Sequence, residues 1–358
     1  MKSNYKPLGK YIQSVERRND ELRDIPLMGL SINKVFIPSI ANTIGTNMAT
    51  YRIVKRNQFA YGPVTSRNGD KITIALFDDY DEALISQAYT PFEVKDSNEL
   101  DPEYLMMWFR RPEFDRYARF KSHGSARKIF DWEEMCNTLL PVPHPDKQCE
   151  IVKEYNTIQN RINLNNQLIQ KLEETAQAIY REWFVEGIEL ENLPEGWKLG
   201  TLEDLVEFKN GKSKPTQIGS YPVYGGNGII EFVDEYNSEN VIPIGRVGAY
   251  CGSLYRELSK CWISDNAISA KSKINCNMFT YYLLNDLKLN EKSKGTGQPL
   301  ITQGMLNNIE IVTPDNNLIK DFEVKALKLF KYENNLQKEN QKLLELKDVL
   351  LSKLATVE

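Results

Sequence analysis

The sequence is poor in the residues that build metal centres and membrane spans. It has 358 residues but only two histidines and five cysteines, with no CxxC pair, which is too few and too scattered for a zinc site. No stretch approaches the ~18 apolar residues of a transmembrane helix, and the first thirty residues lack the apolar core of a signal peptide. We therefore expect a cytoplasmic protein of roughly two or three domains.

An excess of positive charge is also absent. The chain has 45 Lys and Arg against 49 Asp and Glu, a net charge of −4, which taken alone disfavours a nucleic-acid partner. The acidity is concentrated, because residues 144–191 hold 5 Lys and Arg against 9 Asp and Glu, a difference of −4. The rest of the chain is close to neutral.

Motifs for nucleotide hydrolysis and methyl transfer are missing. Gly211-Lys212-Ser213 ends like a phosphate-binding loop, but Val206 stands where that loop needs its first glycine. The GGNGI stretch at 225–229 lacks the GxGxxG spacing and predicts a tight turn. Neither a cofactor-binding glycine turn nor an Asn-Pro-Pro-aromatic motif is present. We predict a non-catalytic chain that binds no cofactor and no metal.

The chain is internally duplicated. A shift of 171 positions (292 minus 121) brings Lys121-Ser122 onto Lys292-Ser293 and Pro143 onto Pro314. The starts also match, with Tyr5-Lys6 against Trp197-Lys198. A repeat of about half the chain length indicates a duplicated domain. Short β-branched and aromatic runs between Gly, Asn, Asp and Pro clusters predict mostly antiparallel strands in both halves, and we expect an α+β fold.

Each half ends in a predicted long helix. Apolar residues recur at steps of four and three over 151–183 and 322–354, the a/d spacing of a coiled coil, with Glu333, Asn340 and Lys347 interrupting the second stretch. Some forty helical residues span about 60 Å. We expect the helices to pair antiparallel along a helix seam that includes Ile151, Ile158, Ile162, Ile169, Leu172, Ile179, Phe322, Leu329, Leu336, Leu343 and Leu350.

Basic residues gather in flexible stretches of both halves. Residues 105–130 mix Lys and Arg with aromatic residues, and 209–214 and 292–299 combine Lys with Gly, Asn and Gln. Such loops can approach a phosphate backbone closely and donate to base edges. A solvated helix face is an alternative for Arg110 to Arg119. The candidates for DNA contact are Lys121, Ser122, His123, Gly124, Ser125, Arg127, Lys128, Lys209, Asn210, Lys212, Lys214, Lys292, Lys294, Gly295, Thr296, Gly297 and Gln298.

Four stretches together resemble the specificity subunits of type I restriction-modification systems, over nearly the whole chain. They are LPVPHPDKQCEIV (140–152), LPEGWKLGTLEDLVEFKNGK (193–212), YPVYGGNGIIEFVDEY (221–236) and GTGQP (295–299). One departure concerns the glutamine that commonly follows each proline-rich turn in the family, because Gln148 is present but its equivalent is Ile319. That departure raises the question of how symmetrically partner subunits dock.

The resemblance implies two target-recognition domains, at 1–143 and 192–314, each followed by a conserved spacer helix, at 144–191 and 315–358. Each domain would read one half of a split asymmetric target in double-stranded DNA, and the helices would set the gap. The helices would also dock two modification subunits, which bring S-adenosylmethionine, and motor and nuclease subunits would join for cleavage.

Two alternatives stay open from the residues. A coiled-coil scaffold without DNA contact agrees with the negative charge. A metal-dependent nuclease would use Glu93 and Lys95, downstream of Asp78, Asp79 and Asp81, to hold a hard divalent cation through oxygen ligands. Of the three readings, only the specificity subunit accounts for the duplication, the long helices and the missing catalytic motifs together.

Overall fold

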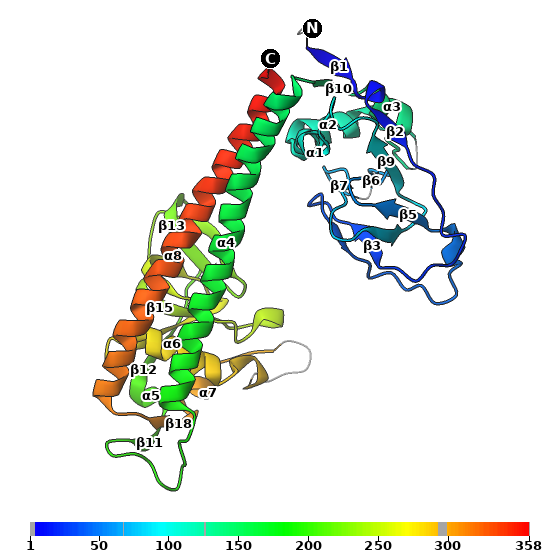
Figure 1. The fold of residues 1–358 in the computed structure, drawn as a ribbon. Helices are drawn as coiled ribbons and strands as arrows, with labels where there is room; N and C mark the ends of the chain where they lie inside the picture. Colours follow the sequence, from blue (N-terminus) through cyan, green and yellow to red (C-terminus); the bar gives the residue numbers. More distant parts are fainter. Residues whose placement is uncertain (1–3, 67, 125–126, 293–298, 358) are drawn as a thin grey trace. The chain divides into compact units, whose positions relative to one another are not determined.

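The computed structural model describes residues 4–66, 68–124, 127–292 and 299–357 (Figure 1). It contains two compact units, and each combines one globular region with part of both long helices. Unit 1 comprises residues 1–164 and 339–358, and unit 2 comprises residues 165–338. The four-segment division expected from the sequence, by contrast, separates helices from globular regions and stays a prediction.

Unit 1 is built from short strands and three short helices. Its four-stranded sheets have the orders β2-β9-β6-β7 and β4-β3-β8-β5, and β1 pairs with β10. Only the β3–β8 pair is parallel among these described strands. The elements are β1 (Tyr5–Pro7), β2 (Ile12–Ser14), β3 (Leu27–Leu30), β4 (Phe36–Pro38), β5 (Arg52–Lys55), β6 (Phe59–Tyr61), β7 (Ile74–Leu76), β8 (Glu82–Ile85), β9 (Thr90–Val94), β10 (Leu139–Pro141), α1 (Pro102–Arg110), α2 (Pro112–Lys121) and α3 (Trp132–Asn137), with 3₁₀ turns η1 (Leu8–Lys10) and η2 (Met48–Thr50).

Unit 2 contains a six-stranded sheet of order β12-β17-β15-β16-β13-β14 and the pair β11–β18. The β13–β16 pair is parallel and the other described pairs are antiparallel. The elements are β11 (Lys198–Thr201), β12 (Val206–Asn210), β13 (Ile218–Gly225), β14 (Gly228–Val233), β15 (Ser238–Gly245), β16 (Glu257–Ile263), β17 (Ala267–Ser272), β18 (Glu310–Thr313), α5 (Leu202–Leu205), α6 (Asn277–Asp286) and α7 (Gln303–Asn307), with 3₁₀ turns η3 (Gly248–Tyr250) and η4 (Leu289–Lys292). The predicted α+β class with mostly antiparallel strands is confirmed.

The two units share one feature, an antiparallel strand pair that joins the two ends of each globular region. In unit 1, β1 pairs with β10, so that Tyr5 lies opposite Pro141. In unit 2, β11 pairs with β18, so that Lys198 lies opposite Thr313. Each pair brings the start of a globular region beside its end, directly before a long helix begins.

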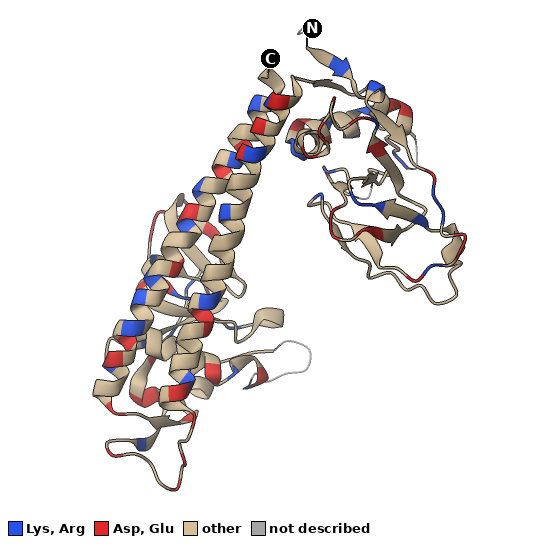
Figure 2. Cartoon of the chain, viewed as in Figure 1, with Lys and Arg blue, Asp and Glu red and all other residues tan. Residues whose placement is uncertain are grey.

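The long helices are α4 (Pro145–Phe184) and α8 (Asn316–Lys353), and α8 continues into the 3₁₀ turn η5 (Leu354–Thr356). Every residue predicted for the helix seam is buried or half-buried, whereas the opposite faces are exposed and carry charges of both signs (Figure 2). No helix in the described part of the chain is long and apolar enough to cross a membrane.

The helices run antiparallel where they meet in each unit. In unit 1, the Arg161 Nε lies 2.8 Å from a carboxylate oxygen of Glu339. In unit 2, the rings of Tyr180 and Phe322 lie 5.8 Å apart, and the Lys325 ammonium lies 5.4 Å from the ring of Trp183. Residues late in α4 thus contact residues early in α8.

The polar residues that interrupt the helix seam have specific partners. Glu333 is buried, and its carboxylate lies 2.9 Å from Nη2 of Arg256, which comes from the globular region of unit 2. The Arg256 guanidinium lies between the rings of Tyr281 and Phe330, at 4.7 and 4.4 Å. Burial raises the pKa of Glu333 above its ordinary value, while Arg256 acts to lower it. The ion pair between Arg256 and Glu333 therefore links the globular region of unit 2 to α8.

Arg256→Ala should destabilise the protein by about 3–5 kcal/mol, because it leaves the buried Glu333 carboxylate without its cation. Denaturant unfolding measures the loss. The double variant Arg256→Met, Glu333→Leu removes both charges and should recover most of it. Lys171→Ala removes an exposed ion pair with Glu174 and should leave stability nearly unchanged. Equal midpoints for Arg256→Ala and Lys171→Ala would contradict the role of Arg256.

Candidate nucleic-acid interface

The first candidate loop of unit 1 begins with a buried serine. Ser122 follows the last residue of α2 and is 8% exposed. Its hydroxyl accepts a hydrogen bond from the Thr65 hydroxyl at 2.9 Å and donates one to the Ala118 carbonyl at 2.6 Å. Ser122 therefore has its hydrogen-bond partners inside the protein and holds the start of the loop.

The same loop closes on itself around a glycine. His123 and Ile129 exchange backbone hydrogen bonds of 3.0 and 2.8 Å. Gly124 has a φ of +121°, and a Cβ atom there would lie 2.2 Å from the Arg127 carbonyl oxygen. Only glycine fits this close approach without a backbone shift, so the geometry of the loop depends on Gly124.

Most cations between residues 105 and 130 are already paired. Arg111 is buried, with its guanidinium 4.3 Å from the ring of Trp108. By contrast, Arg127 and Lys128 are exposed and form no ion pair with a described residue. The other pairs are Arg110 with Tyr155, Arg116 with Glu113, Arg119 with Asp70 and Lys121 with Glu134. Among the described cations of this stretch, the two without such a partner therefore lie in the loop.

In unit 2, the candidates at 209–214 lie at the end of β12, where two loops touch. The backbone N–H of Lys212 donates to the Ile263 carbonyl at 3.0 Å. A Cβ atom at Gly211 would lie only 1.9 Å from the Ser264 carbonyl oxygen. Glycine is required here because the two backbones are in direct contact.

Three further loops meet at the same place. A Cβ atom at Gly245 would lie 2.5 Å from the Gly226 carbonyl oxygen, and one at Gly226 would lie 3.4 Å from the Val247 carbonyl oxygen and 3.8 Å from that of Asn266. Val247 in turn pairs with Leu300. We call the segments that converge here the unit 2 loop cluster: residues 210–214, 225–228, 245–250, 264–266 and 299–301.

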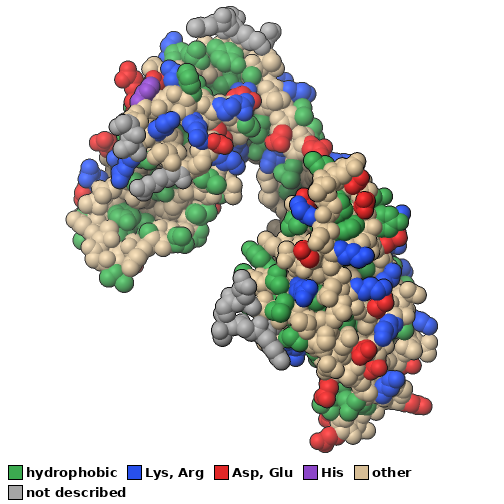
Figure 3. All heavy atoms as spheres, turned by 180° about the vertical axis from the view of Figure 1, so that it is seen from behind, with side chains coloured by type: hydrophobic (Ala, Val, Ile, Leu, Met, Phe, Trp, Pro, Cys, Tyr) green, Lys and Arg blue, Asp and Glu red, His purple; other side chains and the backbone are tan. Residues whose placement is uncertain are grey.

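The candidate cations of unit 2 differ in their surroundings. Lys209 pairs with Glu207 at 3.0 Å, and Lys214 pairs with Glu231. Asn210, Lys212 and Lys292 are exposed, and Lys292 ends η4. Ser125, Lys294, Gly295, Thr296, Gly297 and Gln298 lie outside the described residues. Over the face of unit 2 seen at the lower right of Figure 3, basic and acidic side chains are interspersed.

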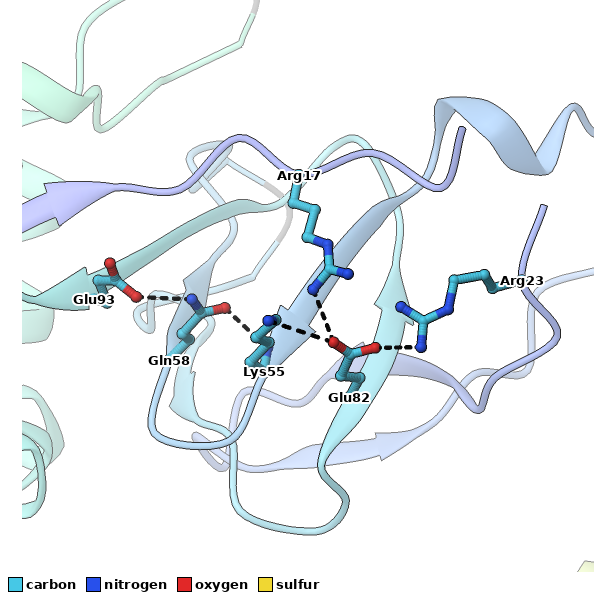
Figure 4. A network of polar contacts seen from close by, with 6 residues as sticks. All are labelled: Arg17, Arg23, Lys55, Gln58, Glu82 and Glu93. Atoms are coloured by element: carbon cyan, nitrogen blue, oxygen red, sulfur yellow. Dashed lines mark hydrogen bonds and ion pairs between the residues drawn. The ribbon is translucent and has the colours of Figure 1, made fainter. Parts of the chain in front are cut away.

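A network that sequence reasoning missed lies on β5 and β8 (Figure 4). The Glu82 carboxylate lies 2.8 Å from Arg17, 2.5 Å from Arg23 and 3.6 Å from Lys55. Desolvation acts to raise the pKa of Glu82, but the hydrogen bonds from Arg23 and Arg17 hold it below its ordinary value. Three cations therefore pair with one carboxylate. Arg17 and Arg23 belong to the irregular segment between β2 and β3, and their ion pairs hold this segment against β8. No local pattern joins residues so far apart in the sequence.

The residues of the nuclease alternative are held by structural hydrogen bonds. The Glu93 oxygens accept from the side-chain amides of Gln58 and Gln13, both at 2.8 Å, and the first contact is drawn in Figure 4. Lys95 donates to the carbonyls of Gly9 and Lys10 at 3.0 and 3.2 Å. Among the described residues, no three His, Cys, Asp or Glu side chains gather as a metal site. This geometry does not support the nuclease hypothesis.

Comparison with known proteins gives consistent matches. The family model described as "Type I restriction modification DNA specificity domain" matches residues 29–174 and 194–348, one segment in each half. The MjaIX specificity subunit of Methanocaldococcus jannaschii is 22% identical over 70% of this chain and 68% of its own. The HindI specificity subunit of Haemophilus influenzae is 20% identical over 90% of this chain and 91% of its own.

Two solved structures share the fold. The S subunit of a type I restriction-modification system from M. genitalium is 18% identical with a TM-score of 0.64, covering 98% of this chain and 95% of its own. A chain from a structure concerning complex assembly and conformational transition of the type I R-M system is 16% identical with a TM-score of 0.51, covering 98% and 96%. Both likenesses extend over both units.

Ser122→Ala should lower the free energy of unfolding by about 0.5–1.5 kcal/mol, because the buried hydroxyl's hydrogen bonds with Thr65 and the Ala118 carbonyl are lost, while Thr65 keeps the Lys128 carbonyl as an acceptor. Ser213→Ala, at an exposed candidate-loop position, is the matched control and should leave stability unchanged. Denaturant unfolding of both variants checks this. A wild-type midpoint for Ser122→Ala would mean that the buried hydroxyl has no structural role.

Proposed function

Because this chain belongs to the family of type I restriction-modification specificity subunits, we propose that each of its globular regions reads one half of a split DNA target. It is a non-catalytic subunit that serves DNA sequence recognition. The observation that carries the proposal is the duplication. The pairs β1–β10 and β11–β18 close two globular regions in the same way, and each leads into a long helix. Two similar globular regions on one chain suit a DNA target with two half-sites.

The contacts fall into two chemical kinds. Exposed cations such as Lys128 and Lys212 suit phosphates, which position a protein without reading sequence. Arg127 lies beside Gly124 in a closed loop, a more fixed setting that suits a base edge. In the second region we assign the corresponding reading role to Gln298. The paired cations Lys209, Lys214 and Lys121 are weaker candidates, since a new phosphate contact would have to displace a carboxylate.

The paired helices set the distance between the two half-sites in this proposal. Their length supports it, because the 40 residues of α4 and the 38 of α8 are long enough for about 60 Å each. The antiparallel contacts within each unit also support it. The predicted boundaries at residues 143, 191 and 314 then separate readers from spacers.

The outer faces of the helices dock the modification subunits. Leu164 and Leu168 are 60% and 36% exposed and lie four residues apart on one face of α4, and Leu344 and Val349 are 50% and 47% exposed on α8. Exposed apolar side chains on paired helices suit a protein partner. Two modification subunits would supply S-adenosylmethionine and methyl transfer, and motor and nuclease subunits would complete the complex.

Substitutions in the two regions should act on different halves of the target. Once the target is known from methylated DNA of cells carrying the complex, Arg127→Ala should reduce discrimination in one half-site and Gln298→Ala in the other. A base-edge contact contributes about 1–3 kcal/mol of discrimination, whereas Lys128→Ala should weaken binding to all sequences and flatten the salt dependence. Binding to duplexes altered in one half-site at a time measures both effects.

Two results would contradict this division. If either variant changes preference equally in both halves, the regions do not read separate half-sites. If the wild-type complex binds duplexes without dependence on salt or sequence, the chain acts as a scaffold instead.

The helix-docking proposal predicts that Leu164→Glu with Leu168→Glu weakens association with the modification subunit at least about tenfold, because burying one leucine contributes ~1.5–3 kcal/mol. Co-purification and titration measure the loss. Ile40→Glu, at a 99% exposed position of unit 1, is the apolar-to-acidic control and should associate normally. Normal association of the double variant would exclude this face of α4 as the docking surface.

A further inference from the structure

Arg246 occupies the unit 2 loop cluster directly after β15. Its backbone N–H donates to the Asn266 carbonyl, and its carbonyl accepts from the backbone N–H of Ile301, both at 3.0 Å. The Cys251 thiol lies 3.1 Å from the same carbonyl. The backbone of Arg246 is therefore held by two separate loops, on each side of the residue.

The neighbouring glycines restrict the position of Arg246 further. A Cβ atom at Gly245 would lie 2.4 Å from the Tyr250 carbonyl oxygen, and Gly248 has a φ of +75°. Pre-organisation of this kind reduces the entropy lost when a side chain binds a ligand.

The Arg246 side chain has an unmet hydrogen-bond requirement. It is half-buried, and its Nε is fully buried without a hydrogen-bond partner among the described residues. A guanidinium keeps its charge and offers five N–H donors in one plane. Because Nε is enclosed by the protein, the donors that a ligand with acceptors can meet at this place are those on the two Nη atoms of the half-buried side chain.

The surroundings indicate which ligand this is. Lys212 and Asn266 are exposed in the adjoining loops of the cluster, and they supply a second cation and an amide. Lys212 is exposed, as suits a phosphate contact. The backbone of Arg246 is fixed and its side chain is partly enclosed, as suits a contact whose geometry must discriminate between bases.

We propose that Arg246 is a specificity-determining residue of unit 2 that donates two hydrogen bonds to a guanine edge in the major groove. The planar guanidinium matches the O6 and N7 acceptors of guanine. The inference rests on the proposed function, in which unit 2 reads one half of the target. It adds the residue and the base that carry part of that reading.

The test measures binding by the full chain assembled with its modification subunits. The probes are target duplexes in which single guanines are replaced by 7-deazaguanine, which lacks the N7 acceptor. The wild-type complex should lose affinity at one guanine of one half-site. Arg246→Ala should lower cognate affinity about 5- to 150-fold and abolish the sensitivity to 7-deazaguanine at that position alone. Lys212→Ala, the matched control, should retain that sensitivity while binding all duplexes more weakly.

A second variant keeps the test decisive if Arg246→Ala unfolds. Arg246→Lys keeps the charge, so it should retain binding to non-target duplexes but lose discrimination at the same guanine. The inference is overturned if Arg246 variants bind all duplexes equally more weakly, which indicates a phosphate contact, or if they bind as wild type. A wild-type complex that discriminates in neither half-site would instead overturn the proposed function itself.

Discussion

The burial of one stripe along each long helix is the constraint on which the rest of the structure depends. An isolated amphipathic helix of about forty residues would expose its apolar stripe to water, and neither helix seam is covered by its own globular region alone. Tyr155 of α4 and Leu351 of α8 share one core with the first globular region. Tyr180 and Phe322 share another core with the second. In each unit, the paired helices and the globular region therefore share one core.

A buried ion pair constrains the relative orientation of two packed elements more than an apolar contact does. Glu333 occupies a seam position, where an unpaired carboxylate would be strongly destabilising. Arg256 neutralises it from the globular region, and Glu173 of α4 lies 3.6 Å from the same guanidinium. Because ion pairs require a defined geometry, the arrangement fixes how the second globular region sits on the helices. We regard this as the reason that a charge is found within an otherwise apolar seam.

Several of the basic side chains are neutralised by carboxylates within the chain. Arg17, Arg23 and Lys55 meet on Glu82, and Arg119 meets Asp70. The helices display both signs together (Figure 2). Exposed cations without an ion pair among the described residues, such as Lys128 and Lys212, lie on loops that contain glycine.

The sequence by itself determined the duplication, the strand-rich regions and the helix seam, because these depend on short-range periodicity that residues carry wherever the chain goes. The seam predicted over 151–183 falls within α4, and the one over 322–354 follows α8 into η5. Which candidate residues are exposed and able to contact DNA was decided only by the tertiary structure. Ser122 is enclosed by Thr65, which lies 57 positions earlier in the sequence.

Gln148 and Ile319 show the same limit of sequence reasoning. The Gln148 side chain is fully buried and bonded to the backbone of Glu99, Asp101 and Pro143, and Ile319 is fully buried in the core of unit 2. The departure from the family pattern therefore concerns internal packing and not an exposed docking face. Likewise, Arg246 gains its distinctive environment only where five loops converge. Whether a polar side chain is satisfied depends on partners that folding brings together from distant parts of the chain, and no local spacing encodes them.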